Sequence, residues 1–460
     1  MRLKGLTFLL CILPLLSEAQ SAFTLKECID YALENNDQLK IQAYEKDIAK
    51  GTIGETTALG LPQVNATAGF QDNLEIQTSF IQDFISPATY SILFDEGLLE
   101  ERDLGPPASF PAQFGTPVTG NAGISVSQLI FNGSYFVGLQ AARALRELTD
   151  TEYIKTEIDV IDAVSKAYYL VLVSQENLEL LSTNYNRLNK LYQETSAMYE
   201  SGFVEKIEVS RLKVQVNNLR SSLSSATELL KVSLAALKLQ MGMSPDDTLE
   251  LTETLDNITL DLEKIPATKV DPENRIEYNI MQQNRNLAML DIKNNKVQYL
   301  PNIYASFNLG WTSGVNTFGD LWQFNDQTWF RYTSWGVSLN IPIFDGFEKK
   351  YKIQQAKYKL GQTELGLTQL SKSFKVEEIN ARTALQNALT EYKINQENVE
   401  LAEEIFQVAE IKYQEGVGSN LEVVDADSEL KTAQTNYLNS LYNALVAKID
   451  LLKALGILNK

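Results

Sequence analysis

The 460-residue sequence contains no histidine. It therefore lacks the side chain that most often serves as a general base and as a metal ligand in proteins. It also shows no glycine-rich phosphate loop, no nucleophile elbow and no cluster with the spacing of a metal site. These absences argue against an enzyme, and we expect neither a cofactor nor a bound metal.

Cysteine is scarce, and basic residues are outnumbered by acidic ones. The two cysteines are Cys11 and Cys28, and Cys11 falls in an expected signal sequence. The mature chain would then keep one cysteine, which excludes an intrachain disulfide, and we expect Cys28 to be an ordinary buried helix residue. The 40 basic and 59 acidic residues give a net charge of −19, which makes a nucleic-acid partner improbable.

The N-terminus has the pattern of a secretory signal over residues 1–19. Arg2 and Lys4 precede an apolar run from Gly5 to Leu16, and Ser17-Glu18-Ala19 offers a cleavage site. The apolar run is too short to span a bilayer easily, so cleavage is favoured over a single-pass anchor.

The chain repeats itself. Each copy contains a Leu-Pro pair, a Phe-Asn/Asp-Gly sequence and a Tyr-x-x-Gly sequence, at Leu61, Phe131 and Tyr199 in the first copy and Leu300, Phe344 and Tyr413 in the second. Gly133 and Gly202 are 69 residues apart, and Gly346 and Gly416 are 70 apart. The matched spacing indicates a duplicated unit, with repeats at 20–243 and 275–460 and a linker at 244–274.

Four segments alternate between apolar and small polar residues, at about 62–72, 119–130, 301–311 and 333–343. Their non-apolar face carries no charge, which is typical of strands in a membrane barrel whose lumen is polar and whose outer face meets lipid. A half-buried sheet of a soluble protein is the alternative.

All four tryptophans, Trp311, Trp322, Trp329 and Trp335, lie at or between the ends of the last two strands. Such placement predicts an aromatic belt at the membrane boundary, although a hydrophobic cluster in a loop would also explain it. The longer connection in the first repeat, about 78–118, is expected to be an exposed external loop. Four strands cannot close a barrel, so two or three copies would have to supply 8 or 12.

The remaining sequence predicts long helices. Only 12 prolines occur, and none lies at 118–244 or 343–460. A first helix is expected from Thr24 to about 57, where Thr24 and Glu27 have capping-box spacing. Residues 134–201 would form a helix about 100 Å long. Return helices are expected at 207–240 and 421–455. One face of the long helix carries apolar and polar residues at alternating three- and four-residue spacing, as in a coiled coil: Leu178, Leu181, Tyr185, Leu188, Tyr192, Thr195 and Tyr199.

The strand pairs, the Phe-Asn/Asp-Gly entries to the long helices, the glycine-containing helix turns and the duplication together resemble the TolC-type outer-membrane efflux channels. The resemblance covers essentially the whole mature chain. It implies an α+β membrane protein in which three copies build a twelve-stranded β-barrel, continued by a periplasmic α-helical barrel. It further implies the outer membrane of a Gram-negative bacterium, a periplasmic adaptor, an inner-membrane transporter, and the role of exit duct in a tripartite efflux or type I secretion system.

The resemblance also assigns a periplasmic gate. Glu422 and Asp425 match the family's two acidic aperture positions, Tyr413 matches its gate tyrosine, and Glu208 matches an acidic gate position in the first repeat. Because Glu422 and Asp425 are three residues apart, they share one helix face, and threefold symmetry would make two carboxylate rings that attract cations. Solvated surface carboxylates are the alternative.

One position departs from the family pattern. An arginine often lies two residues after the turn glycine and helps to hold the gate closed, but this chain has Gly418 there. We hypothesise that Lys206 or Arg211 supplies the missing cation. The turns are also where family members meet their adaptors, and the candidate contacts are Gly202, Phe203, Val204, Gly416 and Val417.

Two other functions are alternatives to an exit duct. A stand-alone diffusion porin would spend most of its length on strands, whereas this chain spends it on helices. A periplasmic coiled-coil adaptor would not need four membrane-type strands or an aromatic belt. We therefore expect a gated exit duct.

Overall fold

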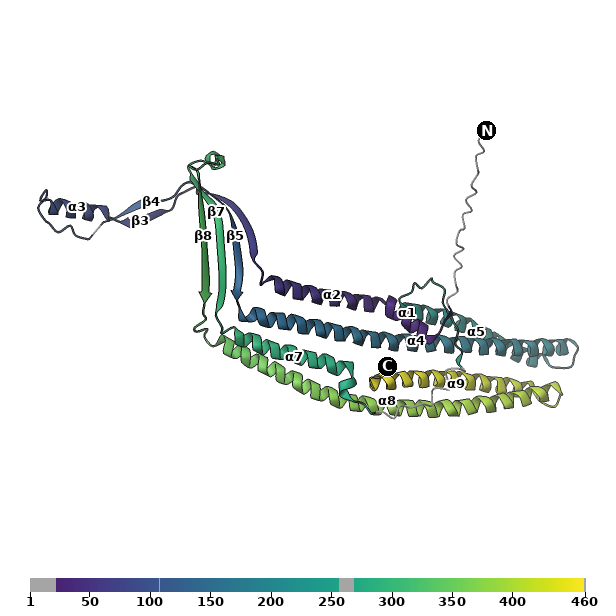
Figure 1. The fold of residues 1–460 in the computed structure, drawn as a ribbon. Helices are drawn as coiled ribbons and strands as arrows, with labels where there is room; N and C mark the ends of the chain where they lie inside the picture. The colour runs from purple at the N-terminus through teal and green to yellow at the C-terminus, as the bar shows by residue number, and fades with distance from the viewer. Residues whose placement is uncertain (1–21, 107, 256–268, 459–460) are drawn as a thin grey trace, which may run out of the picture. The chain divides into compact units, whose positions relative to one another are not determined.

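The computed structural model describes residues 22–106, 108–255 and 269–458 (Figure 1). The expected signal sequence and part of the expected linker lie outside these residues. The chain divides into two compact units. The described residues within 1–50, 144–288 and 358–460 form a helical unit, and those within 51–143 and 289–357 form a unit that contains the main sheet. Both units take segments from both repeats.

The main sheet has four antiparallel strands in the order β2-β5-β7-β8, which lie side by side in Figure 1. Their bounds are β2 Gln63–Asp72, β5 Val118–Phe131, β7 Asn302–Val315 and β8 Trp329–Asn340. Each repeat contributes two neighbouring strands, and the repeats meet where β5 pairs with β7. The strands β2 and β8 are the two edges of this sheet.

The pairing register aligns the alternation of all four strands. Val64 pairs with Val126, which pairs with Phe307, which pairs with Trp335, so one row across the sheet is apolar. The adjacent row is polar and consists of Asn65, Ser125, Asn308 and Ser334. Because directly paired residues point to the same face, the sheet has one apolar and one polar face.

The last strand differs from its expected position. β8 begins at Trp329 rather than near residue 333, because Trp329–Tyr332 pair with residues 310–313 of a longer β7. Trp335 therefore lies opposite Phe307 in the middle of the strand and does not belong to an aromatic group at its end. The expectation that all four tryptophans mark strand ends was wrong for Trp335.

A group of aromatic residues lies where β7 connects to β8. This connection contains the short 3-10 helix η2, Phe318–Trp322. Ring contacts link Phe70 to Phe318 at 5.1 Å and continue through Trp322 and Phe324 to Trp329. The Trp329 indole Nε1 also donates a hydrogen bond to the Leu321 carbonyl oxygen at 2.9 Å. The connection is thus held over the end of the sheet.

The connection between β2 and β5 is a folded extension and not an irregular loop. It contains β3 Thr78–Gln82, α3 Ile85–Asp95 and β4 Ser109–Gln113, and β3 pairs with β4 (Figure 1). None of the α3 residues is buried. The expectation of an exposed segment holds, but the sequence analysis missed its secondary structure.

The helical unit begins with a helix that is broken at Asn36. The helices are α1 Leu25–Asn35 and α2 Asp37–Ala58, where one continuous helix was expected. The Asn36 side chain causes the break, since its Oδ1 accepts from the Gln38 backbone N–H at 2.8 Å and its Nδ2 donates to the Gln240 carbonyl oxygen at 2.7 Å. The capping box of Thr24 and Glu27 is present at the start of α1.

The remaining helices are long. They are α4 Gly133–Glu200, α5 Lys206–Met241, α7 Ile276–Val297, α8 Glu348–Gln414 and α9 Asn420–Ala454. At 68 residues, α4 is about 100 Å long. A 3-10 turn η1, Pro272–Asn274, precedes α7, and a parallel bridge joins β1 Ala22–Phe23 to β6 Glu250–Leu251. None of the described helices is both long and apolar enough to cross a membrane.

The helical unit has two hydrophobic clusters, and α4, α5, α8 and α9 contribute to both. The large helical cluster also includes α1 and contains fully buried Cys28, Val164, Tyr168 and Leu441. The turn cluster lies on the segments that flank the two helix turns and contains Leu188, Leu212, Phe406 and Val423. Cys28 is thus the buried helix residue that was expected, and burial raises the pKa of its thiol to about 12.

Candidate functional site at the helix turns

The two helix turns have the same backbone design. Gly202 follows α4 with φ 81°, and Gly416 follows α8 with φ 74°, both in the left-handed region that glycine adopts without strain. The next backbone N–H groups, those of Phe203 and Val417, donate to the carbonyl oxygens of Met198 at 2.9 Å and Lys412 at 3.0 Å. These bonds satisfy carbonyl groups that the helix ends would otherwise leave free, so each helix pair reverses sharply (Figure 1).

The starts of the return helices differ. Ser419 caps α9, because its hydroxyl accepts a hydrogen bond from the Glu422 backbone N–H at 3.2 Å. Glu205 occupies the corresponding position before α5 and makes no side-chain cap. Glu422 is therefore held at the first turn of its helix, where the helix dipole favours a carboxylate.

Gly418 has a structural reason to be glycine. A Cβ atom at this position would lie 2.7 Å from the Lys412 Cβ and 3.0 Å from the Lys412 carbonyl carbon. The last turn of α8 occupies the space that any side chain would need. The arginine that the resemblance suggested for this position would not fit the turn as it is built here.

Tyr413 connects two helices of different repeats. Its hydroxyl lies 3.0 Å from the Thr195 Oγ1, and Thr195 on α4 is fully buried. The sequence analysis placed Thr195 on the coiled-coil face and Tyr413 at the gate, but it did not pair them. A polar residue on an apolar helix face was the available signal, since a buried hydroxyl needs a partner.

The coiled-coil face itself largely enters the turn cluster. Leu181 and Leu188 are buried there, and Leu178, Tyr185 and Tyr192 pack against it. Tyr199, one turn before Gly202, is exposed. The packing therefore weakens toward the turn.

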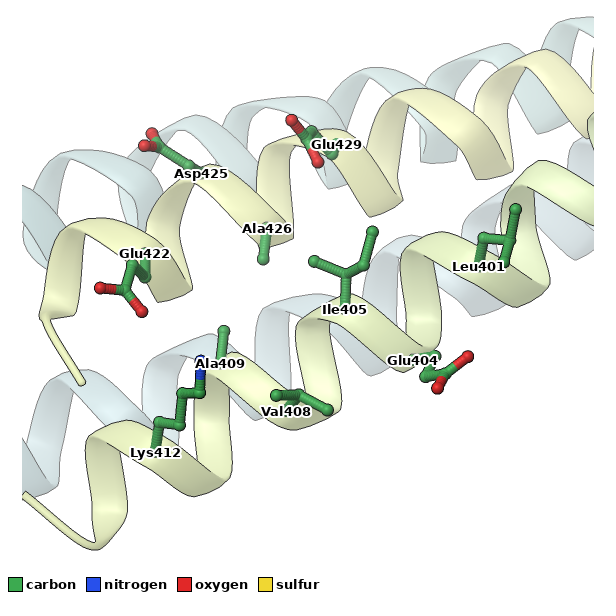
Figure 2. A pocket seen from close by; sticks show the side chains of 10 residues that line it. All are labelled: Leu401, Glu404, Ile405, Val408, Ala409, Lys412, Glu422, Asp425, Ala426 and Glu429. Atoms are coloured by element: carbon green, nitrogen blue, oxygen red, sulfur yellow. The ribbon is translucent and has the colours of Figure 1, made fainter. Parts of the chain in front are cut away.

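Glu422 and Asp425 lie on an open groove between α8 and α9. The groove has a volume of about 540 Å³ and includes Glu404 and Glu429 as well as Lys412. Figure 2 shows the Glu422 carboxylate extending toward α8, whereas the carboxylates of Asp425 and Glu429 point away from it. Apolar side chains of α8, among them Ile405 and Ala409, form its floor. The groove thus has an acidic rim around an apolar surface.

Glu208 lies at a second hollow, which is formed by the two turns together. This hollow has a volume of about 670 Å³, and its lining includes Phe203, Val204, Tyr413 and Asn420. The proposed gate residues Glu208 and Tyr413 thus share one hollow, while Glu422 and Asp425 share the other. Asn420 is 2% exposed, and neither polar atom of its side chain has a hydrogen-bond partner among the described residues.

The two candidate gate cations lie at the start of α5, the helix that also carries Glu208. Lys206 and Arg211 are exposed on α5, and neither has an ion-pair partner in the part of the chain that the structure describes. That one of them supplies the cation missing at Gly418 stays a prediction. The described residues also include no group of three carboxylate, cysteine or histidine side chains that could hold a metal ion.

One buried acid was missed by the sequence analysis. Asp427, two residues beyond Asp425 on α9, is 2% exposed, and burial raises the pKa of its carboxyl group to about 6. Its Oδ2 atom has no hydrogen-bond partner among the described residues. The sequence offered little signal for it, because the run of acids from Glu422 to Glu429 reads as a solvated face.

Comparisons with known proteins agree on one family. The family model described as "Outer membrane efflux protein" matches residues 28–243 and 274–457. The outer membrane protein TolC of Vibrio cholerae is 24% identical, over 98% of this chain and 95% of its own length. The probable efflux pump outer membrane protein TtgC of Pseudomonas putida is 22% identical, over 94% of this chain and 82% of its own length.

Solved structures show the same fold. The crystal structure of CusC aligns with a TM-score of 0.70 and 18% identity, covering 95% of this chain and 92% of CusC. The outer membrane protein VceC of Vibrio cholerae aligns with a TM-score of 0.65 and 16% identity, covering 94% of this chain and 96% of VceC. Both neighbours share the combination of strand pairs and long helix pairs over nearly their whole length.

Proposed function

This chain belongs to the outer membrane efflux protein family, and on that premise we propose that three copies form a duct gated at the helix turns. The protein is an outer-membrane efflux channel of the TolC type. Members of this family are channels and are not known as enzymes. The family favours the exit duct over the stand-alone porin and over the periplasmic adaptor.

The sheet supports assembly with other copies. Within the described chain, β2 and β8 are edge strands whose outer backbone groups have no strand partner. Lipid cannot satisfy such groups, so a sheet that spans a membrane has to close. Pairing β2 of one copy with β8 of the next would close it, and three copies would give the twelve strands expected from the family. The apolar face would then meet lipid, and the row of Asn65, Ser125 and Asn308 would line the lumen.

The gate is proposed at the turns because the hydrogen bond between Tyr413 and Thr195 holds α8 to α4 there. This single observation carries the proposal, since it links the two repeats beside the acidic residues. Glu422 and Asp425 are exposed, so three copies could bring them together around a narrow aperture. Opening would separate the helix pairs, break this bond and move the carboxylates apart. Transport would be diffusion, and no bond of the cargo would be made or broken.

The turns also suit a periplasmic adaptor. Phe203 and Val417 are 82% and 80% exposed, which is unusual for apolar side chains at a helix tip that has no partner. The buried Asn420 amide beside them has an NH2 group that can donate and a carbonyl oxygen that can accept, and the backbone of a docked segment could supply the matching groups. The proposed assembly is thus a homotrimer with an adaptor at the turns and an inner-membrane transporter beyond it.

Single-channel conductance in planar bilayers tests the gate. We expect the wild type to show a small, cation-selective conductance. In the Glu422→Gln/Asp425→Asn variant, cation selectivity and block by multivalent cations should decrease, because the carboxylates no longer attract cations. A large conductance that the two substitutions do not change would contradict the gate.

Neutralising Lys206 and Arg211 together tests the hypothesis that one of them supplies the missing gate cation. That hypothesis fails if the conductance stays unchanged.

A further inference from the structure

Beneath the exposed gate carboxylates, Asp427 on α9 has its carboxyl group inside the helical unit. The Asp427 carboxyl oxygen Oδ2 and the Arg187 guanidinium Nε are both buried without a hydrogen-bond partner among the described residues. No ion pair joins Asp427 to Arg187 among the described residues. A buried carboxylate with incomplete partners destabilises the packing around it, whereas a protonated carboxyl group does so far less.

The neighbouring helices supply few charges. From α4, the Arg187 guanidinium lies 4.0 Å from the centre of the Phe406 ring on α8 and donates to the Asn184 Oδ1 at 2.9 Å. Asn184 in turn donates to the Gln434 Oε1 on α9 at 2.7 Å. These contacts hold Arg187 at Asn184 and the Phe406 ring, and neither of them involves Asp427.

A second cation lies one turn further along α9. Lys431 donates from its Nζ to the Ser222 hydroxyl of α5 at 3.0 Å. Arg187 and Lys431 are the charged groups that act on Asp427, and both lower its pKa, but burial outweighs them and raises the pKa to about 6. The carboxyl group therefore changes from protonated to ionised between pH 5 and pH 8 while it is buried.

We propose that Asp427 positions the gate-bearing end of α9, holding it tightly against α4 and α5 when protonated and less tightly when ionised. This proposal rests on the proposed gate, because it concerns the helix that carries Glu422 and Asp425. The sign follows from linkage. A group whose pKa is higher in the packed state favours that state at low pH, and this advantage is lost as pH rises through the raised value. Opening of the turn end of α9 thus becomes easier from pH 5 to pH 8.

Hydrogen exchange of the full-length trimer tests the proposal directly. The measured quantity is the opening constant of the backbone amides at 420–430, corrected for the intrinsic pH dependence of exchange. We expect the wild type to open about tenfold more at pH 8 than at pH 5. The isosteric variant Asp427→Asn should show no such change, because its side chain does not titrate. An identical pH profile in both proteins would overturn the proposal.

Two comparisons separate this effect from a general loss of charge or packing. Glu429→Gln removes one carboxylate from the exposed side of the same helix and should keep the wild-type profile. Arg187→Gln should move the transition to higher pH, because it removes a cation that favours ionised Asp427, whereas Arg187→Lys should leave it near its original position. An unchanged midpoint in Arg187→Gln would also contradict the proposal.

The outcome is independent of conductance. If Glu422→Gln/Asp425→Asn leaves conductance unaltered while Asp427 controls exchange, the gate proposal fails and the positioning role of Asp427 remains. If the Glu422 and Asp425 carboxylates control conductance, but Asp427→Asn leaves the pH dependence of hydrogen exchange at 420–430 unchanged, the gate proposal stands and this inference fails.

Discussion

The large helical cluster and the turn cluster are built from the same four helices, but the charged groups beside them are partnered differently. Beside the large helical cluster, the partly exposed Lys453 lies 3.0 Å from Asp159 and 2.9 Å from Asp162, and Lys166 lies 2.7 Å from Asp162. In the turn cluster, Asp427 and Arg187 keep unpartnered buried atoms. Asp162 Oδ1 also has no hydrogen bond, but Lys166 pairs with its charge. Since an unpaired buried charge costs more than a paired one, we expect the turn cluster to be the less stable part of the helical unit.

The pKa shifts show the same contrast. Burial lowers the pKa of Lys453, but hydrogen bonds to Asp162 and Asp159 outweigh burial and raise it. The ionised form of Lys453 is thus favoured, whereas burial disfavours ionised Asp427. A raised lysine pKa contributes stability below its ordinary value of about 10.4 and loses it only above that value. Across pH 5 to 8 we therefore attribute pH sensitivity to the turn cluster, consistent with one cluster that stays closed and one that opens.

The largest test of this comparison removes Arg275, which lies beside the large helical cluster at the end of α9. Arg275 is buried, contacts Glu277 at 3.0 Å and Glu377 at 3.3 Å, and donates to the Ala454 carbonyl oxygen at 2.7 Å. Arg275→Met should lower the free energy of unfolding by about 3 kcal/mol, because it leaves these groups unpaired. Thermal unfolding followed by circular dichroism measures the loss.

The matched control for Arg275 is Arg285→Met. Arg285 pairs with Glu364 at 3.1 Å, but both side chains are substantially exposed. Its loss should cost less than about 1 kcal/mol, because water screens exposed pairs. Equal effects of the two substitutions would show that the large helical cluster is not stabilised by its buried pairs and would remove the contrast between the clusters.

Local patterns in the sequence predicted the elements on which this comparison depends. The Thr24–Glu27 capping box, the two turn glycines and the strand alternation act over a few residues, so the sequence shows them directly. The break at Asn36 escaped prediction, because it depends on a bond to Gln240, 204 residues away. The folded extension escaped because β3 and β4 are short and separated by a helix.

The candidate site was predictable in part. The family resemblance located Glu422, Asp425 and Tyr413 near the turns, but it named no partner for Tyr413. Thr195 is 218 residues away in sequence, and helical periodicity gives the face of a residue without identifying what lies opposite. Asp427 was missed for the same reason, since its burial depends on how α9 packs against α4 and α5.

A smaller effect is expected from filling the space at Gly418. Gly418→Ala places a methyl group against Lys412, and such overpacking costs about 1–3 kcal/mol. Because the adjoining turn cluster is the weaker one, we expect the strain to appear there, as faster hydrogen exchange at 412–420 with the large helical cluster unchanged.

The control for this substitution is Gly361→Ala on α8, where a Cβ atom meets nothing within 4 Å. It should leave exchange at the turn unchanged and stabilise α8 by about 0.5–1 kcal/mol, since alanine favours a helix over glycine. If Gly418→Ala behaved in the same way, the turn would have room for a side chain, and the explanation for the missing arginine would be wrong.

The smallest expected effect concerns the bond between Tyr413 and Thr195. Tyr413→Phe removes the hydroxyl that contacts Thr195 Oγ1 and should destabilise the closed turn cluster by about 1 kcal/mol, roughly a fivefold change in the opening equilibrium. Thr195→Val should have a similar effect, and the double variant should cost no more than either single one, because both remove one bond. Leak conductance of the reconstituted trimer measures opening.

Tyr168→Phe is the matched control, since it removes a hydrogen bond of 2.8 Å to Glu253 in the large helical cluster and should leave the leak unchanged. Additive losses in the double variant would mean that Tyr413 and Thr195 do not act through one shared bond. A leak in Tyr168→Phe would mean that opening is not confined to the turn cluster.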